Sequence, residues 1–433
     1  MERLHQEVDV AVVGAGSAGL GAARTLGELG LSCALLEASH RVGGRAYTEE
    51  MAPGVYFDLG CHWMHSASLN PFVAFADAAG FTYRKGTFDR GLRMGNRWAT
   101  DEEAQDRDAF FERAHAALER AHAEGRDISV ADATERDSPW TGLYDYMISL
   151  YTSVDSDQVS ASDLVTYKDT DENWPLKEGY GNLVARLAEG LPVALNSAVT
   201  RIDWSGRTIG LETAKGRVKA RTAIIAVSTG ILGSGDIRFD PDLPDWKQEA
   251  VADLPLGCHN RIGLLFDRDV FGDDHPGSLA LLSEDCEPFA VGVRPFGFNY
   301  VAGLTGGRFA EWLERAGPEA AVDLLKEKLK QSYGSDITKH AGRHLVTAWR
   351  GDPWVKGAYS AAVPGGAHQR AALARPIDER LFFAGEATSP DFFSTCHGAY
   401  LSGIAAANAA AAALGRMPAQ AAKGEATEGE AAR

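Results

Sequence analysis

A glycine-rich turn between two apolar segments near the N-terminus is the feature that most restricts the fold of this chain. Residues 8–13 form the short, nearly continuous apolar run expected of a buried parallel strand. Three glycines follow, and residues 18–29 then place alanine and leucine at helical spacing before Gly30, a typical helix-ending residue. Residues 31–36 form a second apolar run. The pattern predicts a strand, a helix and a parallel strand joined by a glycine turn.

The three glycines of this turn have different steric roles. Gly14 permits the tight turn, Gly16 lets the backbone approach a pyrophosphate, and Gly19 lets the helix pack close to the strand. The N-terminus of the helix offers N–H donors to phosphate oxygens. Glu37 ends the second strand, 18 residues after Gly19, where its carboxylate can accept hydrogen bonds from a ribose hydroxyl. The arrangement predicts dinucleotide binding, and a glycine-rich turn in some other βαβ unit is the alternative.

The residues after Glu37 favour FAD over NAD as the dinucleotide. The segment reads ASHRVGGRAYT, in which Gly43 and Gly44 again permit close approach of the backbone. Arg45 offers a planar cationic fork for a pyrophosphate. An exposed basic loop is the alternative interpretation of this arginine.

Charge and cysteine content restrict the partners and the compartment. The 43 Lys and Arg residues against 60 Asp and Glu give a net charge of −17, which argues against nucleic acid. Five cysteines with no C-x-x-C pair favour a reducing compartment, and the N-terminal residues lack the pattern of a secretory signal. The most apolar stretch, residues 404–414, is shorter than the roughly 20 residues that cross a bilayer. We therefore expect a cytoplasmic protein with neither a membrane nor a nucleic-acid partner.

Motifs at both ends of the chain resemble those of the FAD-dependent amine oxidases. This family includes monoamine oxidases, polyamine oxidases and flavin-dependent histone lysine demethylases. The N-terminal signature is the glycine turn, Glu37 and VGGR (residues 42–45), followed by FDLGCHWMHSASLNP (residues 57–71), which looks like the segment that lines the flavin. The C-terminal signature is AGE (residues 384–386) and HGAYLSG (residues 397–403). The resemblance extends over most of the chain.

The resemblance implies an α/β fold with two domains. A Rossmann-type FAD-binding domain is expected from three discontinuous segments, 7–75, 178–250 and 376–415, and an α+β substrate-binding domain from 76–177 and 251–375. The alternation of residues 206–220 predicts a hairpin, and residues 222–227 and 381–384 predict buried strands. We also expect a surface helix over 101–125, a covering helix over 318–333, an alanine-rich helix from about Gly398 and a disordered tail over 416–433.

The resemblance also implies how the cofactor is bound. Glu386 is expected on the ribitol side of the flavin, and the backbone of Val199 is expected at the adenine, although core packing explains a valine equally well. Ala358 stands where monoamine oxidases carry the cysteine that tethers the flavin, so we predict non-covalent FAD. The predicted cofactor-binding residues are Gly14, Ala15, Gly16, Gly19, Glu37, Ala38, Gly44, Arg45, Val199, Gly385, Glu386 and Ala399.

Three predicted catalytic residues follow from the same resemblance. Tyr359 matches one wall of the aromatic cage of the family, with core packing as its alternative. Thr395 stands where the opposite wall is often a tyrosine, so the cage is incomplete and the amine class stays open. Arg261 stands where the family usually has a lysine bonded through water to the flavin N5. A guanidinium is not a base but can hold a water or stabilise negative charge on the reduced flavin. A slowed reaction with oxygen, or an arginine that merely covers a strand, are the alternatives.

The cluster of Cys61, His62 and His65 has a spacing that suggests a metal. Such a site is incomplete without a fourth ligand, and the segment matches a flavin-lining stretch, so we predict no metal. His62 is instead expected to face the flavin or the substrate. Trp63 and Trp174 are further candidate pocket aromatics, with burial in the core as the alternative.

The reaction implied is the oxidation of a small-molecule amine to an imine, which water converts to an aldehyde or ketone, while O2 is reduced to H2O2. FAD carries out the electron transfer, and the protein positions the substrate and excludes water. One alternative is a flavin dehydrogenase or desaturase of the same fold acting on an amino acid or a carbon–carbon bond. Another is a flavin-binding homologue with impaired turnover, which Arg261 and Thr395 motivate.

Overall fold

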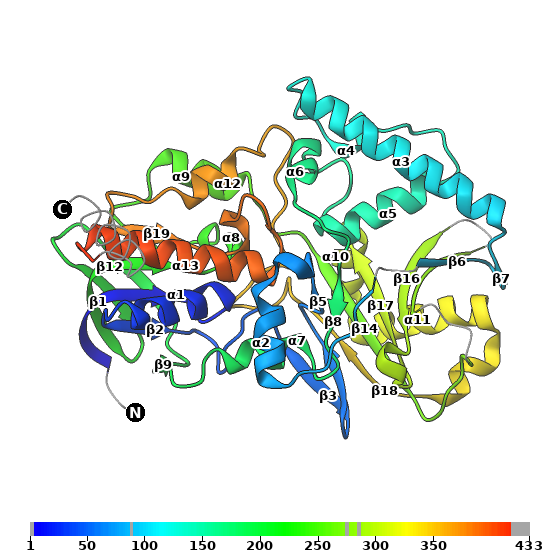
Figure 1. Ribbon diagram of the computed structural model, residues 1–433, viewed down its shortest axis with the longest axis horizontal. Helices are drawn as coiled ribbons and strands as arrows, with labels where there is room; N and C mark the ends of the chain where they lie inside the picture. Colours follow the sequence, from blue (N-terminus) through cyan, green and yellow to red (C-terminus); the bar gives the residue numbers. More distant parts are fainter. Residues whose placement is uncertain (1–3, 87–89, 273–276, 284–286, 417–433) are drawn as a thin grey trace, which may run out of the picture. The chain divides into compact units, whose positions relative to one another are not determined.

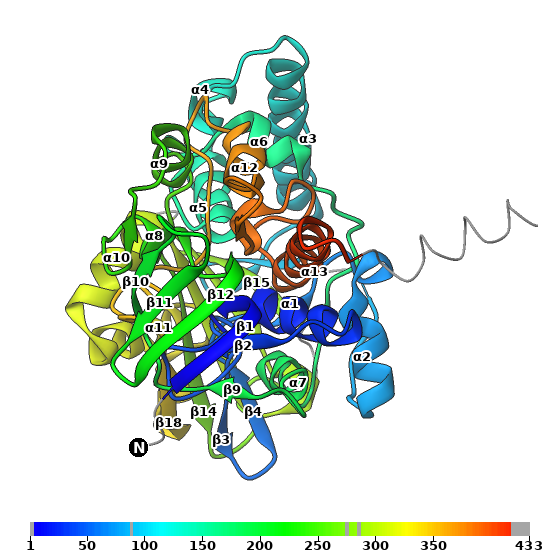
Figure 2. The same ribbon diagram turned by 90° about the vertical axis from the view of Figure 1, so that its left-hand side faces the viewer.

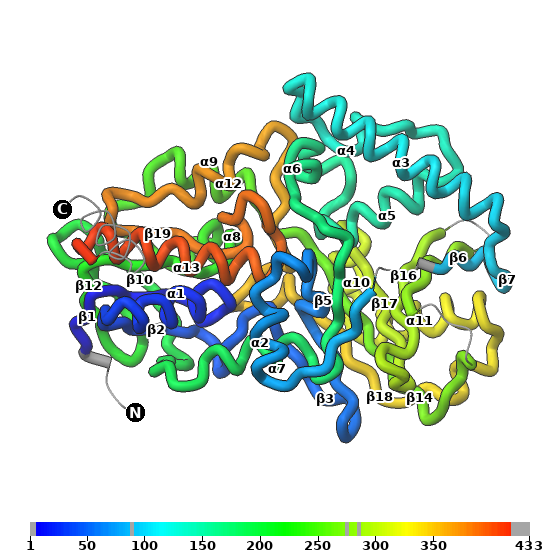
Figure 3. Tube along the Cα trace, viewed as in Figure 1, coloured from blue at the N-terminus to red at the C-terminus, as the bar shows by residue number. Residues whose placement is uncertain are grey.

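The computed structural model describes residues 4–86, 90–272, 277–283 and 287–416, and the described chain divides into two compact units. Unit 1 consists of Met1–Gly44, Val184–Ala252 and Gln369–Arg433, and unit 2 consists of Arg45–Leu183 and Asp253–His368. Each unit is therefore assembled from segments that are far apart in the sequence, as the chain trace shows (Figures 1 and 3). No helix among the described residues is both long enough and apolar enough to span a membrane.

The sheet of unit 1 has eight strands in the order β13-β10-β11-β12-β1-β2-β9, with β19 also paired to β12. The first half of β12 pairs with antiparallel β11, and its last residues pair with parallel β19. The strands are β1 (Leu4–Val13), β2 (Cys33–Leu36), β9 (Val193–Ala194), β10 (Val199–Asp203), β11 (Ile209–Thr213), β12 (Gly216–Ile225), β13 (Arg238–Asp240) and β19 (Leu381–Phe383).

The strand, helix and strand predicted at the N-terminus are confirmed. β1 and β2 are parallel neighbours, and α1 (Ser17–Glu28) connects them. The predicted hairpin is also confirmed, because β11 and β12 are antiparallel. Two details differ. β2 begins at Cys33 rather than at Leu31, and the strand expected over 222–227 belongs to β12, which ends at Ile225, rather than forming a separate element.

Two helices of unit 1, α1 and α13 (Cys396–Ala413), lie side by side (Figures 1 and 2). A Cβ atom at Gly21 would lie 2.8 Å from the Tyr400 carbonyl oxygen, and one at Gly403 would lie 2.0 Å from that of Ala18. Glycine at these two positions therefore allows the two backbones to approach. The other helices of the unit are α8 (Thr229–Leu232), α9 (Asp245–Ala252), α12 (Gln369–Ala374) and the 3₁₀ turn η4 (Glu386–Thr388).

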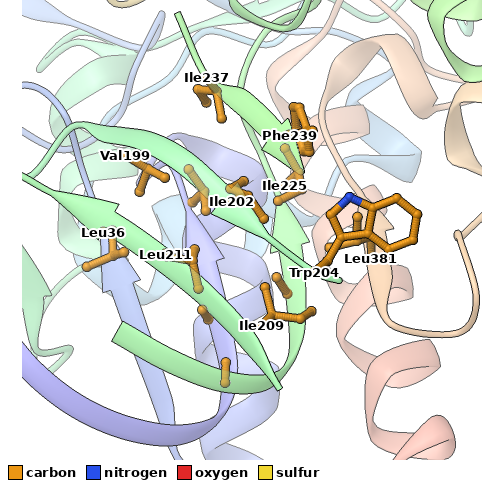
Figure 4. Packing of buried hydrophobic residues seen from close by; sticks show 14 of the residues in the cluster. Leu36, Val199, Ile202, Trp204, Ile209, Leu211, Ile225, Ile237, Phe239 and Leu381 are labelled. Carbon is orange, nitrogen blue, oxygen red and sulfur yellow. The ribbon is translucent and has the colours of Figure 1, made fainter. Parts of the chain in front are cut away.

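The core of unit 1 is formed by apolar side chains of the sheet and of the loops beside it. Ile202, Leu211 and Ile225 lie at its centre, with Trp204 and Phe239 beside them (Figure 4). Burying each large apolar side chain contributes roughly 1.5–3 kcal/mol to stability, so the cluster holds the strands of separated segments together.

The sheet of unit 2 has seven strands in the order β18-β14-β17-β16-β15-β6-β7. Its pairs are antiparallel except that β6 runs parallel to β15. The strands are β6 (Arg90–Met94), β7 (Arg97–Trp98), β14 (His259–Phe266), β15 (Ser278–Leu282), β16 (Pro288–Val293), β17 (Tyr300–Gly306) and β18 (Ala341–Val346). Two smaller pairs are β3 (Thr48–Ala52) with β4 (Val55–Asp58) and β5 (Trp63–Met64) with β8 (Trp174–Pro175).

One face of the unit 2 sheet is covered by α11 (Pro318–Tyr333), which coincides with the predicted covering helix. Ile262 and Leu264 of β14 pack in one cluster with Leu325 of α11. Because side chains alternate along a strand, His259 and Arg261 belong to the opposite face of the sheet.

The predicted surface helix is α3 (Asp101–Ala123). The other helical segments are η1 (Ala67–Leu69), α2 (Pro71–Ala79), α4 (Val130–Ala133), α5 (Thr141–Thr152), α6 (Ala161–Thr166), α7 (Tyr180–Arg186), η2 (Pro295–Gly297), α10 (Gly307–Ala316) and η3 (Ser335–His340).

The predicted FAD-binding segments largely coincide with unit 1, except that residues 45–75 and 178–183 pack in unit 2. The limits of the cofactor-binding domain stay a prediction, because packing units are not the same as ligand contacts. Of the predicted disordered tail, residues 417–433 lie outside the described residues.

Candidate functional site

The glycine turn of unit 1 has the steric features expected of a phosphate-binding turn. Gly14 has a φ angle of +100°, and a Cβ atom there would lie 2.7 Å from the Ala226 carbonyl oxygen. A Cβ atom at Gly19 would lie 1.8 Å from the Gly14 carbonyl oxygen, whereas one at Gly16 would have no atom within 4 Å. Gly14 and Gly19 are therefore required by packing, and Gly16 leaves space beside the N-terminus of α1. A phosphate group fits such a turn.

The loop that contains Gly43 and Gly44 lies against this turn. The Gly43 N–H donates to the Ala15 carbonyl at 2.9 Å, and the Cα atom of Gly16 would be 3.4 Å from a Cβ atom at Gly44. Gly44 has a φ angle of +56°, and its carbonyl accepts a hydrogen bond of 2.7 Å from the Arg41 guanidinium. The two predicted phosphate-contacting segments are thus adjacent in unit 1.

Glu37 is fixed at the end of β2 beside the glycine turn. Its side chain is buried, with Oε2 accepting from the Ala15 N–H at 2.6 Å and Oε1 accepting from the Ser39 N–H at 2.8 Å. A carboxylate has about four acceptor positions, so two remain for a ribose hydroxyl. Ala38 follows and is half-buried. The geometry fits the ribose-binding role, which stays a prediction for both residues.

The C-terminal motif is held by hydrogen bonds to α13 and to the segment just before it. Gly385 has a φ angle of +145° and donates its N–H to the Ser402 hydroxyl at 2.9 Å. Glu386 is buried, and one of its oxygens accepts from the Ser394 N–H at 3.0 Å. Ala399 is half-buried in the first turn of α13. Their contacts to a cofactor stay predictions.

Thr395 is the N-cap of α13, a role that the sequence analysis missed. Its hydroxyl accepts a hydrogen bond of 3.0 Å from the Gly398 N–H and donates one of 2.6 Å to the Phe392 carbonyl. The signal was present, since threonine directly before an alanine-rich helical segment is a common N-cap. Thr395 lies in unit 1 and Tyr359 lies in unit 2, so the two predicted walls of the cage belong to different units.

Val199, in β10, is 6% exposed and its side chain packs in the core of unit 1 (Figure 4). Core packing therefore accounts for the choice of valine. An adenine contact through its backbone stays a prediction.

In unit 2, a hydrogen-bonded network fixes the backbone that carries Arg261. The Arg261 N–H donates to the Thr347 hydroxyl at 2.7 Å, and this hydroxyl donates to the Asn260 side-chain oxygen at 3.1 Å. The amide nitrogen of Asn260 donates to a carboxylate oxygen of Glu314, on α10, at 2.9 Å. The position of Arg261 is thus set by its neighbour in β14, by the residue that follows β18 and by α10.

The Arg261 guanidinium is buried among aromatic side chains. It lies 5.3 Å from the ring centroid of Phe57 and 5.7 Å from that of Trp63. The Phe57 ring covers Gly263, where a Cβ atom would lie only 2.8 Å from it. Among the described residues, no group accepts a hydrogen bond from the Arg261 Nε. Burial lowers the pKa of this guanidinium, whereas the charge of Asp58 acts in the opposite direction.

His62 is held beside Arg261 by a buried carboxylate. His62 Nδ1 lies 2.8 Å from Asp58 Oδ2, and Asp58 Oδ1 accepts from the Thr48 hydroxyl and from the Tyr180 N–H. Burial lowers the pKa of His62, the Arg261 charge lowers it further, and Asp58 opposes both. His62 is therefore neutral at neutral pH. The structure brings the predicted residues His62 and Arg261 together.

His259 connects this cluster to Tyr359. Its ring centroid lies 5.7 Å from that of Tyr359, whose hydroxyl donates to the Leu150 carbonyl. Burial, with a smaller effect of Arg261, lowers the pKa of His259 to about 3. The sequence analysis missed His259, although its position two residues before Arg261 in a strand places both on one face.

Two other sequence-predicted groups of unit 2 have hydrogen-bond partners of their own. His65 bonds through Nδ1 to the Asn173 side chain, and the Arg45 guanidinium donates to the Ala358 carbonyl at 2.6 Å. In the part of the chain that the structure describes, no cluster of three or more His, Cys, Asp or Glu side chains is arranged to hold a metal ion.

Comparison with known proteins identifies the family. Residues 17–411 match the flavin containing amine oxidoreductases. Polyamine oxidase 4 of Oryza sativa subsp. japonica is 30% identical over 445 residues, which cover 92% of this chain and 88% of that protein. Lysine-specific histone demethylase 2 of Homo sapiens is 28% identical over 94% of this chain, but over only 54% of the demethylase. The chain belongs to the flavin-containing amine oxidoreductase family, which confirms the resemblance.

A solved structure has the same fold. Cyclohexylamine oxidase from Brevibacterium oxydans IH-35A superposes with a TM-score of 0.79 and 20% identity over 94% of this chain and 100% of that chain. The fold is thus the mixed α/β fold of the amine oxidases. With the family match, the chain is an FAD-dependent oxidoreductase that oxidises amines.

Proposed function

We propose that this protein oxidises a small aliphatic amine to an imine, with non-covalently bound FAD as the hydride acceptor and O2 as the final acceptor, which leaves as H2O2. The observation that carries the proposal is the buried Arg261 guanidinium between Phe57 and Trp63. A fixed positive charge there favours the negative charge of a reduced flavin. The surrounding apolar groups favour a neutral amine over an ammonium ion.

Unit 1 is proposed as the Rossmann-type FAD-binding domain. The N-terminus of α1 and the space at Gly16 would hold the pyrophosphate, and Glu37 would accept hydrogen bonds from the ribose of the adenosine. Glu386 and the backbone of Val199 would contact the ribitol and the adenine. Ala358 offers no nucleophile for a covalent bond to the flavin, which supports non-covalent binding.

The substrate proposed first is an aliphatic di- or polyamine, because the rice relative is named a polyamine oxidase. His62, Arg261 and Tyr359 are proposed on the substrate side of the flavin. Thr395 stays a predicted cage residue, and its hydroxyl also caps the first turn of α13.

A cytoplasmic location is proposed from the state of the cysteines. Cys33 and Cys258 are thiols, and burial raises the pKa of each to about 12, so both stay protonated and unreactive. Buried thiols of this kind fit a reducing compartment.

A second candidate function is an amine dehydrogenase that passes electrons to an acceptor other than O2. The observation that favours it is Arg261 itself, because the family usually has a lysine at this position. The substitution Arg261→Lys separates the two functions. For a dehydrogenase, the variant should accelerate reoxidation of the reduced flavin by O2 at least tenfold while the rate of flavin reduction changes little.

The test of the proposed function begins without oxygen. The purified protein is titrated with a panel of monoamines, diamines, polyamines and amino acids while the flavin absorbance is followed. We expect aliphatic amines to bleach the flavin, and admission of air to restore its absorbance with one H2O2 per amine. A flavin that no amine bleaches contradicts amine oxidation, and bleaching by amines without recovery in air supports the dehydrogenase.

A further inference from the structure

Asp58 and His62 form a buried carboxylate–imidazole pair with a defined proton position. Asp58 is 3% exposed, and its two oxygens accept hydrogen bonds from Thr48, Tyr180 and His62. An ionised carboxylate only accepts hydrogen bonds, so the 2.8 Å contact requires the proton of the neutral imidazole to lie on Nδ1. His62 Nε2 therefore carries a lone pair.

The sequence gives no reason to expect this pair. Asp58 ends β4 and His62 lies four residues later, before β5. The two are brought together because the Asp58 carboxylate is anchored from two sides, by Thr48 of β3 and by the N–H of Tyr180. The anchored carboxylate then fixes the orientation of the imidazole.

We propose that His62 is the base that takes the proton from the substrate ammonium, and that Asp58 is a positioning residue that holds His62 in the tautomer this requires. The inference deepens the proposed function and rests on it, since it assigns the reacting amine to the side of unit 2 where His62 and Arg261 lie.

The proton transfer to His62 needs no reactant beyond the amine, the imidazole and water. An N–H bond of the ammonium breaks, the proton forms an Nε2–H bond on His62, and the electron pair stays on the amine nitrogen. Bound FAD would supply the acceptor for the hydride of the α-carbon, and the part of His62 is to leave the amine neutral. The imidazolium releases its proton to water. A histidine at hydrogen-bond distance is the usual general base for such a transfer and typically contributes 10²- to 10⁴-fold.

The charges around His62 suit a base that must not keep its proton. Arg261, from β14, disfavours the imidazolium, and His65, from the same segment, adds a small effect in the same direction. Asp58 alone stabilises the imidazolium. His62 thus returns to the neutral form between turnovers, ready for the next ammonium ion.

The variant His62→Asn removes the base and keeps the fold. The asparagine amide can still donate to Asp58 Oδ2, so the buried carboxylate keeps its three hydrogen bonds. At saturating amine and without oxygen, we expect flavin reduction at pH 7 to fall about 100-fold. The rate should then rise about tenfold per pH unit and come within about threefold of the unmodified protein at pH 10, where the amine arrives without its extra proton.

The variant Asp58→Asn tests the tautomer separately. Its amide oxygen can accept from Thr48 and Tyr180, while its NH2 group donates to His62 Nδ1 and forces the imidazole proton onto Nε2. Histidine is still present but cannot accept a proton, so the same loss at pH 7 and the same recovery at pH 10 are expected. His344→Asn, on β18 and paired with the exposed Glu319, is the matched control and should change the rate less than twofold at every pH.

Several outcomes distinguish this inference from the proposed function. If no amine bleaches the flavin of the unmodified protein, the proposed function fails and the inference with it. If amines bleach the unmodified protein, and the rate of flavin reduction in His62→Asn at pH 7 is within threefold of the unmodified rate, His62 is not the base. A loss that is equal at all pH values, or one seen in only one of the two variants, equally overturns the proposal. Flavin content and thermal midpoint confirm that both variants are folded.

Discussion

The glycine turn of unit 1 and the cluster of unit 2 formed by Arg261, Asp58, His62 and His259 are polar sites of opposite kinds. In the turn, backbone groups form the site, and the charged side chain of Glu37 beside them accepts two backbone hydrogen bonds. In the cluster, charged and titratable side chains form the site, and the Nε of Arg261 and the Nδ1 of His259 are buried without a hydrogen-bond partner among the described residues.

The difference shows where stability and reactivity reside. A buried polar atom without a partner costs about 1–3 kcal/mol. The cluster therefore lowers the stability of the folded protein, whereas the hydrogen bonds of the turn raise it. Groups with strongly shifted pKa values also concentrate at functional sites. We therefore expect changes in the turn to affect folding and cofactor retention, and changes in the cluster to affect pH dependence and rate.

The largest expected effect comes from the turn. Gly19→Val would drive a Cβ atom to within 1.8 Å of the Gly14 carbonyl oxygen, so we expect a loss of more than about 4 kcal/mol, or no folded protein. Gly16→Ala adds a methyl group to open space, so the apoprotein should keep its stability while its affinity for FAD falls at least tenfold. Urea unfolding and FAD titration measure the two effects.

The control for this pair is Gly27→Ala, in the same helix and also facing open space. It should leave FAD affinity unchanged and stabilise the protein by about 0.5–1 kcal/mol. If Gly16→Ala and Gly27→Ala bind FAD with equal affinity, the turn at Gly16 does not contact the cofactor, and the proposed difference between the two sites is wrong.

A smaller effect is expected from the pH dependence of the cluster. The pKa of His259 is about 3 in the folded protein and 6.5 in its ordinary state, so the unfolded chain binds the additional proton between these values. Stability is therefore present above pH 6.5 and is lost as the pH falls toward 3. Between pH 8 and pH 5 the free energy of unfolding of the unmodified protein should fall, and in His259→Phe this fall should be smaller by about 1–2 kcal/mol. Urea unfolding at both pH values measures it.

His115→Ala is the control for this prediction, because His115 is exposed on α3 and pairs with the exposed Glu119. It should leave the pH dependence of stability unchanged within about 0.5 kcal/mol. A His259→Phe protein that loses as much stability in acid as the unmodified one would mean that His259 is not a titrating member of the cluster.

The smallest effect is expected at Thr395, whose hydroxyl caps α13. Thr395→Val removes the N-cap of α13 and should cost about 1 kcal/mol, whereas Thr395→Ser keeps the hydroxyl and should cost less than half of that. Flavin reduction at saturating amine should stay within threefold in both variants. A large loss of rate in Thr395→Val with unchanged thermal stability would instead support the predicted place of Thr395 in the cage.

The local elements were predictable because their patterns are local. The strand, helix and strand around Gly14, Gly16 and Gly19 follow from apolar periodicity and from three positions that exclude a side chain. The helix over 318–333 and the hairpin at 206–220 follow in the same way. Arg261 and His62 were identified from motif positions.

Their mutual arrangement was decided by tertiary structure. Asp58 positions His62 because residues 122 apart, Asp58 and Tyr180, meet through one hydrogen bond. The pairing of β14 with β17 and β18 fixes which of its two faces is covered by α11. His259 lies on the other face, together with Arg261, and so joins the cluster. The sequence by itself thus determined the backbone geometry of the turn, which depends on the absence of side chains at fixed spacing. Only the tertiary structure decided the protonation of the cluster, because a pKa depends on burial and on charges brought near from distant segments.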